Sequence, residues 1–226
     1  MPAHVVLVHG LWGGPWSWDA VVERLDAADV TSSAVALPMR SLDEDASVVT
    51  SRLDEIADPV VLVGHSYGGA VITQAGNHPQ VRELVYLAAF QLVDGESVNS
   101  VLPDRGIPGT ALGSALQIDG DVIALDPELA TGLLYNATAP EVAAAAMTRA
   151  VPVSRAVFRG VPTAFAWRDR PSTYVVCQDD LCVNPDLQRA MAERADTVLE
   201  WPGDHSPLVS RPDDVAALLF ELASSL

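Results

Sequence analysis

The chain has 226 residues, and 13 basic against 30 acidic residues give it a formal charge of −17. So negative a surface disfavours nucleic acid and anionic membranes as partners, and no apolar run reaches the roughly 18 residues needed to span a bilayer. The N-terminus lacks the basic and apolar regions of a secretory signal, so a cytoplasmic protein is expected. There the two cysteines, Cys177 and Cys182, are expected to be buried thiols rather than a disulfide, and their spacing without a further ligand pair argues against a metal site.

Short runs rich in valine and leucine recur along the chain without alternation of polar and apolar residues. Such runs predict strands that are buried on both faces of a parallel sheet. In chain order they cover residues 4–10, 32–38, 59–64, 83–90, 172–178 and 196–202. Helical patterns lie between and after them, at 17–28, 41–57, 67–78, 185–195 and 212–226. This succession of strands and helices predicts a doubly wound α/β domain.

Residues 91–170 interrupt this succession. They begin with glycine, proline and aspartate punctuation, continue into helical stretches such as 140–151, and contain no convincing buried strand. We interpret this segment as a cap of helices and loops, inserted between the fourth and fifth predicted strands. The core would then consist of residues 1–90 and 171–226.

The stretch LVGHSYGGAV at 62–71 places Ser66 between glycines, where a predicted strand stops and a helix starts. The pattern G-x-S-x-G is common by itself, but a sharp strand-to-helix turn projects the serine hydroxyl out of the sheet. Gly64 and Gly68 fit such a turn because it leaves no room for side chains beside the serine. The N-terminus of the next helix directs N–H groups toward a negative charge that forms there. Ser66 is therefore the candidate nucleophile.

A serine hydroxyl needs a base that removes its proton as it attacks. The histidines are His4, His9, His65, His78 and His205. Of these, His205 lies in a loop after the last predicted strand, at the carboxyl edge of the sheet where ligands bind and where Ser66 is expected. The acid that orients the histidine is expected at the end of the preceding strand. Asp179 and Asp180 both stand there, and the residues alone leave the choice between them open.

An oxyanion that forms at the attacked carbonyl needs two N–H donors. One is the backbone N–H of Tyr67, directly after the serine, and the other is expected from the loop after the first strand, where Leu11 is the candidate. Gly10 and Trp12 flank Leu11 and are expected to border the substrate pocket. Two further tryptophans, Trp16 and Trp18, lie close by, and at least one of them is expected to pack the first helix onto the sheet.

Four motifs together resemble the α/β-hydrolase superfamily, specifically its small esterases related to plant methylesterases and hydroxynitrile lyases. They are VHGLWGGPWSW, GHSYGG, the DxxxxP of Asp180 to Pro185, and GDHSPLVSRPDDVAALL. The resemblance implies the α/β-hydrolase fold, with a six-stranded core sheet, a helical cap and no cofactor. The family's order of serine, aspartate and histidine matches Ser66, an aspartate and His205. Its aspartate stands five residues before a proline, so the resemblance selects Asp180 over Asp179.

The predicted function is that of a serine hydrolase that cleaves a small or medium, mostly apolar carboxylic ester or lactone through an acyl-enzyme. Its partner would be the small-molecule ester, with a homodimer as an option. Two alternatives stay open: a lyase or specialised biosynthetic reaction that uses the same triad, and a ligand-binding relative without catalysis. The lyases carry a threonine in the oxyanion loop and a lysine after the catalytic histidine. Gly10 and Ser206 stand at those positions, which favours hydrolysis.

Overall fold

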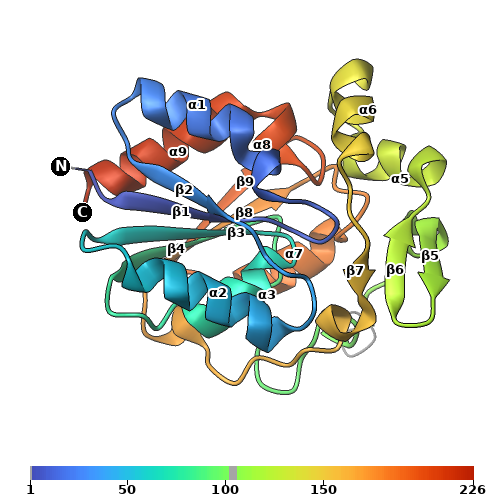
Figure 1. Cartoon of the computed structure of the whole chain (residues 1–226), viewed down its shortest axis with the longest axis horizontal. Coiled ribbons are helices and arrows are strands. Elements are labelled where there is room, and N and C mark those ends of the chain that lie inside the picture. The colour runs from blue at the N-terminus through green and yellow to red at the C-terminus, as the bar shows by residue number, and fades with distance from the viewer. Residues whose placement is uncertain (1, 102–105) are drawn as a thin grey trace.

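The computed structural model describes residues 2–101 and 106–226. A parallel sheet of six strands lies at its centre, in the order β2-β1-β3-β4-β8-β9 (Figure 1). The strands are β1 (His4–Val8), β2 (Ser32–Val35), β3 (Val60–His65), β4 (Val81–Leu87), β8 (Ser172–Cys177) and β9 (Thr197–Trp201). Each of them overlaps one of the predicted runs, so the predicted number and direction of the strands are confirmed.

The burial of the strands explains why the valine-rich runs form this sheet. Every residue of β1, β3 and β8 is buried, whereas the outer strand β9 has no fully buried residue. A strand covered on both faces can be apolar throughout, which is the pattern of the central runs. The edge strand β9 keeps polar side chains because one of its sides faces solvent.

Helices cover both faces of the sheet, as Figure 1 shows. On one face lie α1 (Asp19–Ala27), α8 (Pro207–Ser210) and α9 (Pro212–Ser224), and on the other α2 (Leu42–Asp54), α3 (Gly68–Ala75) and α7 (Pro185–Ala192). The helix predicted at 17–28 begins with a short 3-10 helix, η1 (Pro15–Trp18). Helix α2 starts where its sequence predicts, since the Ser41 hydroxyl accepts a hydrogen bond from the Glu44 N–H.

A small subdomain is inserted between β4 and β8, and it is not made of helices and loops alone. It contains α5 (Pro127–Leu134) and α6 (Pro140–Thr148), together with an antiparallel sheet of β5 (Leu116–Asp119), β6 (Val122–Leu125) and β7 (Val153–Ser154). The expectation of a cap without strands is therefore wrong in this detail. Strand β5 has no buried residue, so it carries none of the apolar signal that marks the core strands. The predicted cap includes residues 102–105, which lie outside the described residues.

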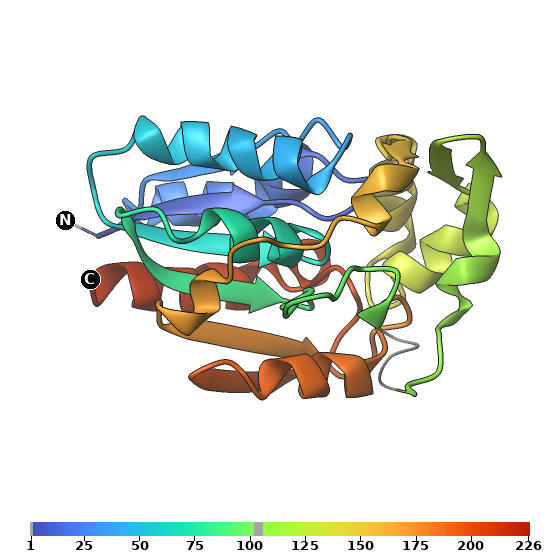
Figure 2. The ribbon, with the colours of Figure 1, turned by 90° about the horizontal axis from the view of Figure 1, so that it is seen from below.

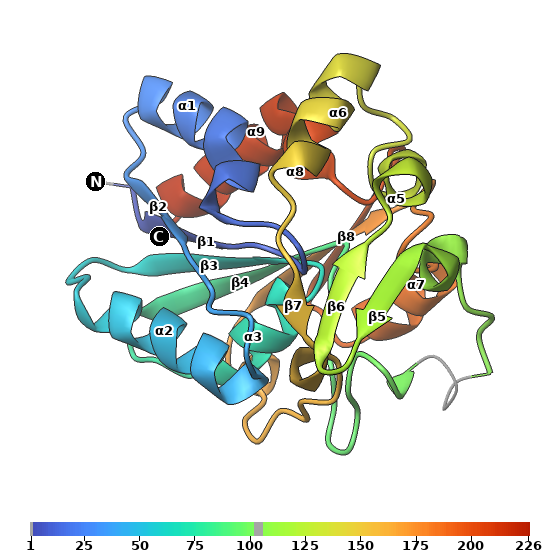
Figure 3. The same ribbon diagram turned by 45° about the vertical axis from the view of Figure 1, so that its right-hand side comes forward.

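The subdomain lies beyond the carboxyl ends of the core strands, as Figure 2 shows from below. Figure 3 shows the same subdomain from another side, with β5, β6 and β7 in front of the ends of the core strands. Both termini lie at the opposite end of the molecule (Figure 2). The subdomain therefore covers the edge of the sheet at which the candidate site residues were predicted.

Cys177 and Cys182 are both buried and free, so the prediction of thiols rather than a disulfide is confirmed. Within residues 2–101 and 106–226, none of the helices has the length and apolar character that a bilayer crossing requires.

Candidate active site

Ser66 occupies a strained turn between β3 and α3. Its φ of 53° lies in the left-handed region, which a residue with a side chain rarely adopts. The turn is held from both sides, because the Ser66 N–H donates to the Leu87 carbonyl and the Ser66 carbonyl accepts from the N–H groups of Gly69 and Phe90. Such strain persists only where the surroundings enforce it, and it is a common feature of reactive sites.

The glycines on either side of Ser66 are dictated by close backbone contacts. A Cβ at Gly64 would lie 2.5 Å from the Gly68 carbonyl oxygen, and one at Gly68 would lie 2.5 Å from the Val8 carbonyl oxygen. Neither position can carry a side chain without moving main chain. The G-x-S-x-G pattern is therefore a steric requirement of this turn.

The register of the sheet brings the loop after β1 to Ser66. Val8, the last residue of β1, pairs with Gly64 of the neighbouring strand β3, so the next residues of both chains leave the sheet together. The backbone hydrogen bonds among the described residues include none donated by the N–H groups of Leu11 or Tyr67. These two donors are the ones that the sequence suggested for an oxyanion.

Asp180 and His205 are in direct contact. The His205 Nδ1–H donates to Asp180 Oδ2 at 2.7 Å, and both side chains are buried. Parallel pairing of β8 with β9 explains this contact, since Cys177 pairs with Trp201 and the two loops leave the sheet side by side. Asp179, in contrast, is exposed, and its carboxylate accepts from the Gly203 N–H at 3.0 Å. Of the two aspartates, only Asp180 reaches the histidine.

The Asp180 carboxylate is surrounded by donors. Oδ1 accepts from the N–H groups of Cys182 and Val183 at 2.7 and 2.8 Å, and Oδ2 also accepts from Gln188 Nε2 at 2.7 Å. Gln188 is fully buried and is itself fixed, because its Oε1 accepts from the Cys177 N–H at 2.9 Å. These donors hold the carboxylate at the Nδ1 side of the histidine, which leaves Nε2 as the free nitrogen of the ring.

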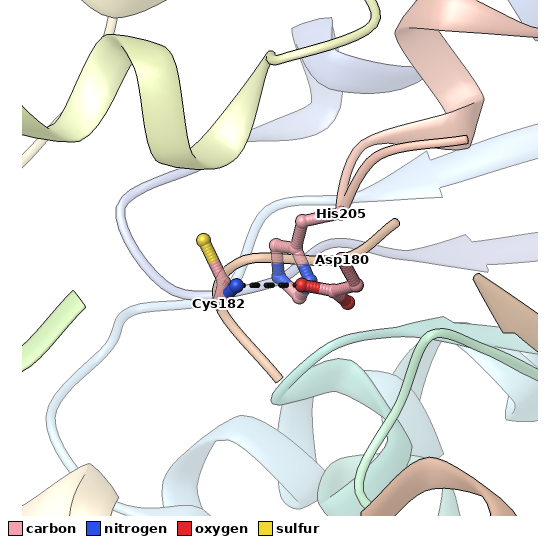
Figure 4. Close-up of side chains that lie close together, drawn as sticks. All are labelled: Asp180, Cys182 and His205. Carbon is pink, nitrogen blue, oxygen red and sulfur yellow. Dashed lines mark hydrogen bonds and ion pairs between the residues drawn. The ribbon is translucent and has the colours of Figure 1, made fainter. Parts of the chain in front are cut away.

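Asp180, Cys182 and His205 offer ligand atoms within 4.8 Å of one another, a spacing that would suit a metal ion (Figure 4). Their chemistry fits a hydrogen-bonded group better. The carboxylate oxygens are already committed to four donors, and burial raises the pKa of the Cys182 thiol well above its ordinary value, with the negative charges of Asp180 and Asp204 adding to the effect. In Figure 4 the sulfur of Cys182 points away from the carboxylate.

His65 is a member of the site that the sequence analysis did not assign. Its Nε2–H donates to the backbone carbonyl of His205 at 2.7 Å, and the two imidazole rings are 4.9 Å apart. His9 is also buried, with its Nδ1–H donating to the Gly10 carbonyl and its Nε2 accepting from the Leu37 N–H. Both rings are thus held as neutral tautomers that fix the main chain around the site. The GHS motif contains the signal for His65, but only the fold reveals which loop it contacts.

Burial lowers the pKa of His65 to about 3, with a further contribution from His205, and lowers the pKa of His9 to about 4. An unfolded histidine has a pKa of about 6.5, so below that pH the unfolded chain binds more protons than the native one and the free energy of unfolding falls. We expect His65→Gln, which keeps a donor for the His205 carbonyl, to reduce this loss. Between about pH 7.5 and pH 5.0 the loss should be smaller than in the wild type by about 2 kcal/mol. Urea unfolding of both proteins at the two pH values measures it, and equal losses would contradict the assignment.

A cavity of about 80 Å³, partly open to solvent, lies between the sheet edge and the subdomain. Ser66, His205, Gly10, Leu11 and Trp12 all border it. The subdomain contributes mostly apolar side chains, among them Leu112, Leu125, Leu134, Met147, Ala150 and Phe158. Trp12 is fixed by its indole N–H, which donates to the Ile123 carbonyl at 3.1 Å, and Trp18 is fully buried in the core as predicted.

Tyr135 supplies a polar group among the mostly apolar side chains that the subdomain contributes, and the sequence analysis did not identify it. Burial raises the pKa of its phenol to about 12, with Asp204 next in effect, so the hydroxyl stays protonated at neutral pH.

The hydrogen bonds within the described parts of the chain include none between Ser66 and His205. Such contacts are often long until substrate binds.

The fold and this arrangement of residues define a class of protein. A family model described as the alpha/beta hydrolase family matches residues 5–218, and the chain belongs to that family. The predicted α/β-hydrolase fold, with its six-stranded parallel sheet and inserted subdomain, is thereby confirmed.

Among individual relatives, Methylesterase 7 of Arabidopsis thaliana is 30% identical over 256 residues, covering 96% of this chain and 95% of its own. The α/β hydrolase nvfD of Aspergillus novofumigatus is 28% identical over 238 residues, covering 95% of this chain and 94% of its own. The crystal structure of polyneuridine aldehyde esterase covers 98% of this chain and 99% of its own at 21% identity and a TM-score of 0.84. That of a pyrethroid hydrolase from Sphingobium faniae covers 99% and 98% at 22% identity and a TM-score of 0.83. The chain is an α/β hydrolase related to plant methylesterases.

Proposed function

We propose that the protein is a serine esterase in which Ser66, His205 and Asp180 form the catalytic triad. Ser66 Oγ attacks the carbonyl carbon of an ester or lactone while His205 Nε2 takes its proton. The N–H groups of Leu11 and Tyr67 bind the oxyanion, and Asp180 stabilises the imidazolium without taking a proton. His205 then protonates the departing alkoxide. In the second half His205 removes a proton from water, which attacks the acyl carbon. The bond from that carbon to Ser66 Oγ breaks, the carboxylic acid leaves, and the imidazolium returns its proton to Oγ.

One observation carries this proposal. A buried Asp180–His205 pair, joined at 2.7 Å, borders the same cavity as a serine whose backbone is held at a positive φ. The esterases among the relatives support the same reaction class. An ordinary structural turn would need neither a strained serine nor a histidine fixed by a carboxylate with four donors.

The lining of the cavity supports a mostly apolar substrate. Leucine, methionine and phenylalanine side chains from the subdomain line the cavity that Ser66 borders, and each apolar group of the substrate would gain from leaving water there. The Tyr135 hydroxyl is the group of this lining that would bind a polar substituent on the ester. A small or medium carboxylic ester with an apolar acyl or aryl part fits this set of contacts.

The lyase alternative is disfavoured by the oxyanion loop. A Cβ at Gly10 would lie 2.8 Å from the Ser66 Cβ and 3.0 Å from His65 Nδ1, so a threonine there would displace the nucleophile. Ser206, directly after His205, also borders the cavity and offers no positive charge for a departing cyanide. Ester hydrolysis needs neither group.

A substrate panel tests the proposal directly. Purified protein is assayed with p-nitrophenyl acetate and butyrate, methyl esters and lactones, beside cyanide release from mandelonitrile, and is then treated with a fluorophosphonate probe. We expect ester turnover, probe attachment at Ser66 and no cyanide. Cyanide release without ester hydrolysis would favour the lyase reaction, and a protein that takes up no probe would favour the ligand-binding alternative.

A further inference from the structure

Asp204 is a buried carboxylate that the proposed mechanism leaves unused, although it directly precedes His205. Its side chain is fully buried, with 0% exposure. Burying an ionised carboxylate costs several kcal/mol unless hydrogen bonds compensate it. A carboxyl group buried this deeply needs hydrogen-bond partners for both of its oxygens.

The two oxygens of Asp204 bind two different parts of the molecule. Oδ1 accepts from the Ser206 N–H at 3.1 Å and from Ser210 Oγ at 2.7 Å, both in the segment that carries His205. Oδ2 accepts from the Ala137 N–H at 2.9 Å and from Thr138 Oγ1 at 3.0 Å, both in the connection between α5 and α6. A single carboxylate thus joins the subdomain to the histidine loop.

The connection that binds Asp204 also contacts the loop of the catalytic acid. Asn136 Nδ2 donates to the Asp179 carbonyl at 3.0 Å, one residue before Asp180. Residues 136–138, which we call the cap anchor, therefore touch the loops after both β8 and β9. The anchor directly follows Leu134 and Tyr135, which border the cavity. The position of the anchor therefore determines the position of Leu134 and Tyr135 in the pocket wall.

The main chain of His205 is consequently held from two sides. On one side, the Asp204 carboxylate connects it to the subdomain. On the other, the imidazole of His65, next to Ser66, donates to the His205 carbonyl at 2.7 Å. Loss of either support would let the imidazole move relative to Ser66. A displacement of about 1 Å is enough to slow a reaction on the order of 100-fold.

We propose that Asp204 is a positioning residue that couples the seating of the cap anchor to the placement of His205. This inference rests on the proposed esterase function, because the imidazole it positions is the proposed base. Asp204 touches neither substrate nor the reacting atoms. It acts because one side chain holds both the cap anchor and the loop of His205, so that the two are positioned together.

Asp204→Asn is the informative substitution because it keeps the shape of the side chain. An asparagine has one carbonyl oxygen, so its amide nitrogen must face either the Ala137 N–H or the Ser206 N–H, neither of which can reverse its direction. We expect kcat for p-nitrophenyl butyrate to fall about 100-fold. Hydrogen exchange followed by mass spectrometry should become faster in peptides that contain residues 135–139 and 204–206.

Two further variants separate positioning from general stability. Thr138→Val removes, on the anchor side, one of the four hydrogen bonds to Asp204, and we expect faster exchange at 135–139 and a fall in kcat of about fivefold, smaller than that of Asp204→Asn. Asp169→Asn removes a negative charge from an exposed residue and should leave both exchange and kinetics unchanged.

The proposal is overturned if Asp204→Asn keeps kcat within about twofold of the wild type, or if kcat falls while exchange at both segments stays as it was. A wild-type protein that hydrolyses no ester would instead sink the proposed function. The exchange measurement does not depend on turnover, so it would still decide whether Asp204 joins the anchor to the histidine loop.

Discussion

Replacement of Ser66 by alanine is expected to abolish ester hydrolysis, with kcat lower by about a million-fold. The substitution removes only the hydroxyl, but without it the reaction has no nucleophile, and the remaining catalysis comes from substrate binding and the oxyanion donors. Any substrate that gives a measurable rate in the panel described above serves for the assay. Fluorophosphonate labelling should be lost in the same variant.

Ser51→Ala is the matched control for this prediction. Ser51 lies on the exposed side of α2, where its hydroxyl donates to the Ser47 carbonyl, and it borders none of the cavity. Its loss should leave turnover and labelling unchanged. Alanine at φ 53° carries the same backbone strain as serine, so Ser66→Ala should keep its fold, which circular dichroism can verify. Near-normal hydrolysis by a folded Ser66→Ala protein would rule out the proposed nucleophile.

The core of the fold could be predicted because its central strands are buried on both faces. Such strands show themselves as continuous valine and leucine runs, and the first of them, at 4–10, overlaps β1 (His4–Val8). The strands of the subdomain carry a weaker signal, since β5 has no buried residue and β6 (Val122–Leu125) buries only Ile123 and Leu125. Their signal is a turn: Gly120 and Asp121 separate two short runs that pair as a hairpin, with Gly120 at a φ of 56°. A search for two-residue turns would have found it.

Some residues of the candidate site could likewise be predicted from the sequence, and others could not. Ser66, Asp180 and His205 stand at the ends of strands, and parallel pairing brings such ends to one edge, so sequence order is sufficient to suggest their meeting. His65, Gln188, Tyr135 and Asp204 act through tertiary contacts between different elements and loops. His65 and His205 are 140 residues apart along the chain, and no local pattern encodes that an imidazole meets a particular carbonyl. Tyr135 depends further on how the subdomain folds back over the sheet.

The second large effect on kcat is expected at Asp180, one of the two adjacent aspartates. Asp180→Asn is expected to lower kcat about ten-thousand-fold, because the amide can present its N–H to His205 and favour the wrong imidazole tautomer. The asparagine carbonyl oxygen can take the place of Oδ1 and accept from the N–H groups of Cys182 and Val183, which holds the new side chain in place while its amide nitrogen faces His205. The loss should therefore appear in kcat rather than in KM.

Asp179→Asn is the control for this substitution, since it removes the same charge one residue away. Its side chain is exposed and accepts from the Gly203 N–H, a bond that the asparagine carbonyl oxygen can keep. We expect kcat/KM within about threefold of the wild type, because an exposed charge is screened by water and salt. Steady-state kinetics of the two variants on one ester decide the matter. Equal losses in both would mean that negative charge near the loop, and not the Asp180–His205 contact, sustains the reaction. A larger loss in Asp179→Asn would reverse the assignment of the acid.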